Sequence, residues 1–380
     1  MKISRSLKNY TVFNLILYGY AIFHKPRNKH EILEYQISIA KNLGFNNLIE
    51  MFEEIYSIDF EKYIRISSQI IMETQDLFVQ YLNWFKKRFK IESFDMNTYF
   101  ALFSKKMTQL FEISNKEFVL TDLIPKQLKN RQLTISYKTK QRNIGKSIIV
   151  YKESGDKIFL LGGGPVLYPV FLHEFGHIYH ISRLKEKSPF WEIAITDRCL
   201  SEEFFSQLFE ISFLFSKELQ KLEFQDILQS DVYNFYYFHR LLEIRKIFGR
   251  IPIDYLFMKA NSTEELYRQE QFLKQEYDKF VQTSMGFSCP GNFGLEQIGF
   301  KEYLFNDNSI FYAIGLLYVE NFISKFGFNW MDNAEAMDTL NRIMFDSASI
   351  DKILSEDPKA FVDFLYRIEK YIQEFLSKQS

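Results

Sequence analysis

The chain has 380 residues, of which 47% are hydrophobic and 25% are charged, and this balance argues against wholesale disorder. Its 47 basic and 48 acidic residues nearly cancel, so the net charge points neither to nucleic acid nor to an anionic membrane as a partner. Only Cys199 and Cys289 are present, too few for a disulfide framework, which fits a cytoplasmic protein whose thiols stay reduced.

Residues 1–23 combine a basic start with a short apolar run and loosely resemble a signal peptide. The run is interrupted by Asn14, and no small-residue cleavage site follows it. It is also too short to span a bilayer, and no other stretch reaches the roughly 18 uninterrupted apolar residues of a membrane span. We therefore expect an N-terminal helix of a cytoplasmic protein.

The next segments predict helices and then a small sheet. From His30 to Phe111, apolar residues recur at the three- and four-residue spacing of helices. Three short strands with a hairpin turn between the last two follow, at Leu133 to Tyr137, Ser147 to Tyr151 and Lys157 to Leu161.

After Pro165 the apolar spacing is again helical. The clearest predicted helices are Val166 to Ile181, Asp197 to Leu222, Val232 to Phe248, Thr263 to Val281, Ser309 to Phe326 and Pro358 to Leu376. The sequence thus predicts a mainly α protein, a single large helical body with a small β-sheet inserted before the helix at 166–181. No linker is evident, so we expect one continuous domain, with an N-terminal helical region at 1–130 and the sheet and later helices at 131–380.

Three of the six histidines fall within FLHEFGHIYH, residues 171–180. His173 and His177 are four residues apart, so on a helix both can face one cation. Glu174 lies beside them, where it can take a proton from a metal-bound water. Two imidazole nitrogens, one carboxylate oxygen and an open position for water favour Zn²⁺, one ion per chain. The alternative is a core helix whose histidines are hydrogen-bonded.

The following predicted helix can supply the third ligand. Glu203, Ser206 and Glu210 form a polar stripe between aromatic residues. We predict Glu203 as the metal ligand and Glu210 as a hydrogen-bond partner of a ligand imidazole. Glu202 lies about a hundred degrees around the helix and should point elsewhere, and Glu192 falls in the connection. The alternative is that the stripe is a solvated face.

The run HEFGHIYH followed by EFFSQLFE resembles the thimet oligopeptidase and oligoendopeptidase F family of HExxH zinc metallopeptidases. In that family a ligand glutamate opens an E-x-x-S-x-x-x-E helix, with which Glu203, Ser206 and Glu210 are in register. His180 matches the family's extra histidine. The resemblance spans residues 135–222 and implies a zincin-type oligopeptidase architecture with a substrate cleft, along which a peptide could join the sheet edge. It also implies supporting positions for His180 and Ser206 near the ligands.

Departures from the family pattern affect substrate binding. Family members are longer, and the missing part would precede the sheet. Their C-terminal section carries a histidine and several tyrosines that bind substrate, whereas residues 301–318 hold no histidine. Aligning the AIG run makes Tyr312 the candidate oxyanion stabiliser, with Tyr303 in reserve and Asn308 at another tyrosine position.

Three functional hypotheses follow. The leading one is a zinc metalloendopeptidase of the oligopeptidase type with a peptide substrate. The second is a catalytically degenerate zinc-binding and peptide-binding protein of the same fold. The third is a related metallocarboxypeptidase, in which Arg240, Arg245 or Arg250 would hold the substrate's C-terminal carboxylate. The sequence leaves the oligomeric state open.

Overall fold

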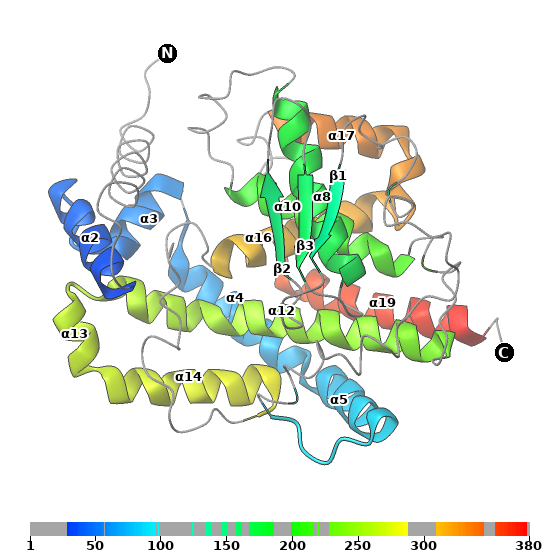
Figure 1. Ribbon diagram of the computed structural model, residues 1–380, viewed down its shortest axis with the longest axis horizontal. Helices are drawn as coiled ribbons and strands as arrows, with labels where there is room; N and C mark the ends of the chain where they lie inside the picture. Colours follow the sequence, from blue (N-terminus) through cyan, green and yellow to red (C-terminus); the bar gives the residue numbers. More distant parts are fainter. Residues whose placement is uncertain are drawn as a thin grey trace. The chain divides into compact units, whose positions relative to one another are not determined.

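The computed structural model (Figure 1) describes residues 29–56, 58–95, 98, 124, 134–138, 146–150, 157–161, 167–185, 199–215, 219, 228–287, 309–345 and 354–377. These residues are mostly helical, which confirms the predicted mainly α class. No helix among them has both the length and the apolar character needed to cross a membrane.

The chain divides into two compact units. One comprises Met1–Met72, Phe190–Asp197 and Arg245–Phe311, and the other comprises Glu73–Pro189, Arg198–Ile244 and Tyr312–Ser380. The division predicted at residue 130 falls outside the described residues and stays a prediction.

The first unit is built of helices around an aromatic core. The ring of Phe52 lies 5.4 Å from that of Phe60 and 5.2 Å from that of Phe311. The described elements of this unit are α2 (Lys29–Asn42), α3 (Leu48–Tyr56), most of α4 (Phe60–Glu73), the C-terminal part of α12 (Gln229–Lys259), α13 (Thr263–Arg268) and α14 (Glu270–Met285).

Helix α12 is longer at both ends than the predicted helix at 232–248, and it continues through Pro252. A proline inside a helix leaves the carbonyl four residues earlier without its backbone donor. Here that carbonyl belongs to Phe248, and Ser67 Oγ donates a hydrogen bond to it. The lost backbone bond is thus replaced, so the helix does not end there. The helix predicted at 263–281 is instead divided at Gln269, between α13 and α14.

The second unit contains the sheet and the HEFGH helix. Strand β3 (Lys157–Leu161) lies between β1 (Thr134–Lys138), to which it is parallel, and β2 (Lys146–Val150), to which it is antiparallel. The helices of this unit are α5 (Gln75–Phe89), α8 (Leu167–Lys185), α10 (Cys199–Ser212), the N-terminal part of α12, most of α16 (Ser309–Phe326), α17 (Ala334–Phe345) and α19 (Pro358–Ser377). Helix α8 contacts both β2 and β3, and it packs along α10 (Figure 1).

An aromatic cluster joins α8, α10 and α16 in the core of this unit. The Phe209 ring packs edge-on against Phe175 at 5.1 Å and against Trp330 at 5.6 Å. Phe322 on α16 lies 5.8 Å from the same tryptophan. Trp330 Nε1 donates to Ser212 Oγ at 2.9 Å, at the point where α10 gives way to the 3₁₀ turn Phe213–Phe215. Helix α10 ends at Ser212, earlier than the predicted helix at 197–222.

Candidate metal centre

Two glycines allow α8 and α16 to approach the same turn of α10. A Cβ atom on Gly176, inside the HEFGH run, would lie 2.6 Å from the Phe205 oxygen and from Ser206 Cα. A Cβ atom on Gly315 would lie 3.0 Å from the Glu203 carbonyl carbon. Larger side chains at either position would push these backbones apart. The glycines thus fix how far Glu203 stands from the residues of α8.

His173, His177 and Glu203 form a three-ligand group. One ligand atom from each lies within 4.8 Å of the others, so the group could hold a metal ion. The Nε2 atoms of the two histidines are 3.2 Å apart. His177 is buried, and the other two residues are half-buried. The structure therefore brings together the three residues that the sequence predicts as ligands.

Hydrogen bonds hold two of these side chains in place. His173 Nδ1 lies 2.9 Å from Glu210 Oε2, and with Nδ1 donating, Nε2, which faces His177 Nε2, is the nitrogen that could bind a metal. The Ser206 hydroxyl has one hydrogen to share between two acceptors of Glu203, the carbonyl oxygen at 2.9 Å and Oε2 at 3.2 Å. Glu210 thus contacts one of the predicted ligands and Ser206 contacts another.

The carboxylates around His173 change its protonation. Burial disfavours the imidazolium, but the hydrogen bond and charge of Glu210, with the charges of Glu203 and Glu174, outweigh burial and raise the pKa of His173 to about 9. Burial also lowers the pKa of His177 well below its usual value, and the charge of His173 adds to this effect. A cation bound by Nε2 of His173 and Nε2 of His177 therefore replaces the proton that His173 carries in the metal-free protein.

Glu210 carries a second ion pair on its other oxygen. Its Oε1 accepts from Arg240 Nη1 at 2.8 Å. Burial acts to raise the pKa of Glu210, but the charge of Arg240 and the hydrogen bond with His173 together lower it. Glu210 is therefore an ionised acceptor between His173 and Arg240.

The remaining predicted residues lie at different distances from the three-ligand group. Glu174 is half-buried on α8, directly after His173. Tyr312 is half-buried on α16, and its ring is stacked with that of His173 at 6.5 Å, with 13° between the planes. His180 is buried, and its ring stacks on Phe205 at 4.8 Å. It does not belong to the three-ligand group. Four further residues lie outside the described part of the chain: Glu192, Cys289, Tyr303 and Asn308. The same holds for the side chains of Cys199 and Glu202.

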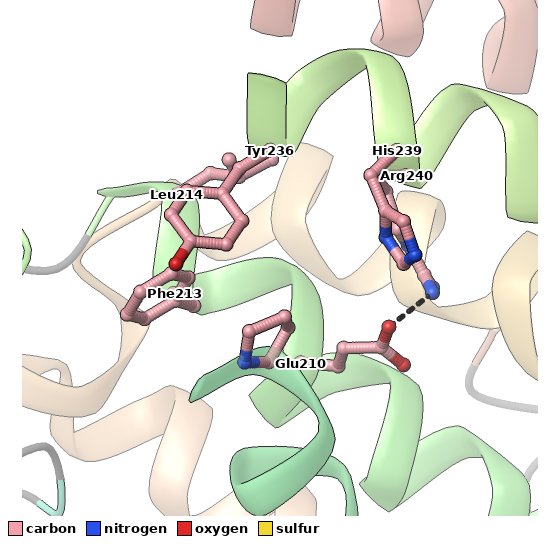
Figure 2. A pocket seen from close by; sticks show the side chains of 7 residues that line it. Glu210, Phe213, Leu214, Tyr236, His239 and Arg240 are labelled. Atoms are coloured by element: carbon pink, nitrogen blue, oxygen red, sulfur yellow. Dashed lines mark ion pairs between the residues drawn. The ribbon is translucent and has the colours of Figure 1, made fainter. Parts of the chain in front are cut away.

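A small cavity adjoins Glu210 on the side of α12 (Figure 2), with a volume of about 10 Å³. Its lining includes Glu210, Phe213, Leu214, Tyr236, His239 and Arg240. No role is predicted from the sequence for Tyr236 and His239, and Arg240 is predicted only as a candidate carboxylate binder. The sequence does carry a signal for a buried polar contact here, an arginine and a histidine inside the apolar run YYFHRLLEI. Charged side chains that are buried require partners.

A comparison with known protein families gave no match, and neither did a comparison with curated proteins.

Proposed function

We propose that the protein is a zinc-dependent metallopeptidase that hydrolyses peptide bonds of oligopeptides. The observation that carries the proposal is the group formed by His173, His177 and Glu203, with Glu174 beside it on α8. Two zinc-bound nitrogens at about 2.0–2.1 Å from a tetrahedral ion stand about 3.3 Å apart. The 3.2 Å between the two Nε2 atoms is close to this value. Two nitrogens, one carboxylate and an open fourth position are also the donor set of catalytic zinc.

Two side chains near this group, those of Glu174 and Tyr312, act in the proposed hydrolysis together with a bound zinc ion. A bound zinc ion supplies Lewis acidity for the scissile carbonyl and lowers the pKa of water. Glu174 accepts the proton of the attacking water and passes it to the leaving amine. The Tyr312 hydroxyl donates to the oxygen that becomes negative in the transition state. Stacking of the Tyr312 ring with His173 supports this role, because it keeps the side chain near the metal ligands.

The proposed architecture is that of a zincin, with a small sheet before the motif helix and a substrate cleft. Support comes from the position of β3, which precedes α8 in the chain and contacts it. β1 and β2 are the outer strands of the described sheet, and an extended peptide could pair with an outer strand.

The test is cleavage of a quenched-fluorescent peptide library by the purified protein. Glu174→Gln removes the proton acceptor and is expected to lower kcat by several orders of magnitude while zinc stays bound. Chelator treatment is expected to abolish cleavage, and zinc is expected to restore it. Glu202→Gln is the matched control and should retain activity. Cleavage that survives both Glu174→Gln and chelation would contradict the proposal.

A catalytically degenerate zinc-binding and peptide-binding protein is the second candidate. The observation that favours it is that residues 301–318 hold no histidine beside Tyr312. One zinc ion per chain without cleavage of any library peptide would support this candidate. The metallocarboxypeptidase stays a prediction, and its three candidate arginines have partners within the protein. Arg240 pairs with Glu210, Arg245 donates to backbone carbonyls, and Arg250 pairs with Asp254.

A further inference from the structure

Arg240 is a buried cation whose contacts lead toward the metal ligands. Its side chain is 7% exposed. Nη1 donates to Glu210 Oε1, and Nη2 donates to Gln207 Oε1. Both acceptors are on α10, so one guanidinium on α12 holds two side chains of the ligand-bearing helix. Figure 2 shows the ion pair with Glu210. The other oxygen of Glu210 lies 2.9 Å from His173 Nδ1.

This contact chain limits how the His173 ring can turn. A free carboxylate can rotate and offer either oxygen in several directions, but Arg240 holds Oε1 of Glu210. Oε2 then has one position from which it accepts from His173 Nδ1. The ring plane is fixed by this bond, and with it the direction in which Nε2 faces the metal.

The space beside Arg240 argues against direct contact with a substrate. The adjoining cavity has a volume of about 10 Å³, which is room for about one water molecule. A peptide carboxylate does not fit there. Arg240 therefore acts on the protein's own residues.

We propose that Arg240 is a positioning residue of the metal centre, which acts through Glu210 to orient the imidazole of His173. This inference rests on the proposed zinc site, but not on peptidase activity.

The test is the zinc affinity of purified variants, measured by competition with a chromogenic chelator. Arg240→Met removes both donors, and we expect its zinc affinity to fall about 10–100-fold, the usual effect of losing a partner of the ligands. Arg240→Lys keeps the charge but cannot hold Glu210 and Gln207 together, so it should restore only part of the affinity. Arg88→Gln is the matched control. This substitution removes the ion pair between Arg88 on α5 and Asp231, which lies on α12 as Arg240 does. The variant should bind zinc as the unaltered protein does.

A double-mutant cycle separates positioning from general destabilisation. If Arg240 acts through Glu210, then Arg240→Met should cause no further loss of zinc affinity once Glu210→Gln is present. The double variant also avoids a buried unpaired carboxylate, so it should fold even if Arg240→Met alone does not. If Arg240→Met alone does not fold, the zinc affinity of the double variant is compared with that of Glu210→Gln. The zinc affinity of Arg240→Lys is then compared with that of the unaltered protein.

Different outcomes overturn different claims. Unchanged zinc affinity in folded Arg240→Met, or losses from the two single changes that multiply in the double variant, would overturn the positioning role alone. If Arg240→Met alone does not fold, a zinc affinity of Arg240→Lys equal to that of the unaltered protein would also overturn the positioning role. No zinc binding by the unaltered protein would overturn both proposals. Zinc binding that depends on Arg240, without peptide cleavage, would support this inference and contradict the peptidase.

Discussion

Glu203 converts a pair of histidines into a three-ligand group. The histidines lie on α8, whereas Glu203 lies on α10, so the group depends on the packing of two helices. Ser206 Oγ donates to Oε2 of Glu203, which restricts its rotamers. The carboxylate is therefore positioned before any metal arrives, and less conformational entropy is lost on binding.

Replacing Glu203 with alanine should weaken zinc binding strongly. Loss of a supporting residue alone costs about 10–100-fold in affinity, so loss of a ligand should cost more than about 100-fold. Competition with a chelating indicator measures this. Glu374→Ala is the control, because Glu374 lies on α19 in an exposed pair with Lys370. Equal effects of the two substitutions would contradict the assignment of Glu203.

The hydroxyl of Tyr312 should matter for turnover and not for metal binding. Tyr312→Phe keeps the ring that stacks with His173 but removes the donor. We expect kcat to fall about 10²–10³-fold, the usual effect of losing one oxyanion donor. Zinc affinity and KM should stay nearly unchanged. An unaltered kcat would exclude this role and direct attention to Tyr303.

Residue spacing was sufficient to predict the parts of the site that local structure controls. His173 and His177 share a helical face, and Glu203, Ser206 and Glu210 share the next one, because both sets follow the helical repeat. Arg240 could not be assigned in this way. It reaches Glu210 from a helix that begins at Gln229, and no local rule specifies a contact between helices so far apart in the chain.

Helix packing around α10 depends on residues without side chains. A Cβ atom on Gly176 would meet the backbone of α10 at 2.6 Å, whereas one on Gly315 would meet it at 3.0 Å. A Cβ atom on Gly176 would therefore require α8 and α10 to separate. A Cβ atom on Gly315 would require the backbone of α10 to shift by only a few tenths of an ångström. The two glycines therefore differ in how strictly they set the position of Glu203.

Alanine at these two positions should have graded effects. We expect Gly176→Ala to destabilise the protein by about 1–3 kcal/mol, the usual cost of overpacking, and to weaken zinc binding because α10 moves away from His173 and His177. Gly315→Ala should have the same effects to a smaller degree. Thermal unfolding and zinc titration of both variants test the order. A larger effect at Gly315 would contradict this account of the packing.

Element boundaries were predictable where the signals were local. The helix at Ser309–Phe326 has the predicted bounds. Two others differ, and at each point of difference a residue distant in the chain donates a hydrogen bond. Ser67 replaces the backbone donor that Pro252 removes, so α12 continues. Trp330 donates to Ser212 where α10 ends. Neither partner is near in sequence, so the local pattern could not reveal these hydrogen bonds.

The division into two units had no signal in the sequence. Three of its five boundaries, after Met72, Ile244 and Phe311, fall inside α4, α12 and α16. Linkers are recognised by proline, glycine and polar residues, and continuous helices carry no such composition. The three candidate ligands, together with Tyr312 and Arg240, belong to the second unit. The stability of that unit therefore bears directly on the centre.

A buried acid on α16 makes the stability of the protein depend on pH. Glu320 is 2% exposed, and its Oε1 accepts from Ser324 Oγ and from Arg367 Nη2. Burial raises the pKa of Glu320, as do the charges of Asp357 and Asp363, and together they outweigh the two donors. A carboxyl with a raised folded-state pKa contributes stability that is fully present below the unfolded value of 4.5. This contribution is lost as the pH rises through the folded-state pKa.

Glu320→Gln should therefore raise the Tm at pH 7, because the amide is neutral and still offers an oxygen to Ser324 and Arg367. The advantage should shrink as the pH falls, and it should vanish near pH 4, where the carboxyl of Glu320 is itself neutral. Glu374→Gln is the control on α19, since Glu374 forms an exposed pair with Lys370 that is worth at most about 1 kcal/mol. Thermal unfolding between pH 4 and 8 measures both. A lower Tm for Glu320→Gln at pH 7 would mean that the pair with Arg367 outweighs the cost of burying the charge.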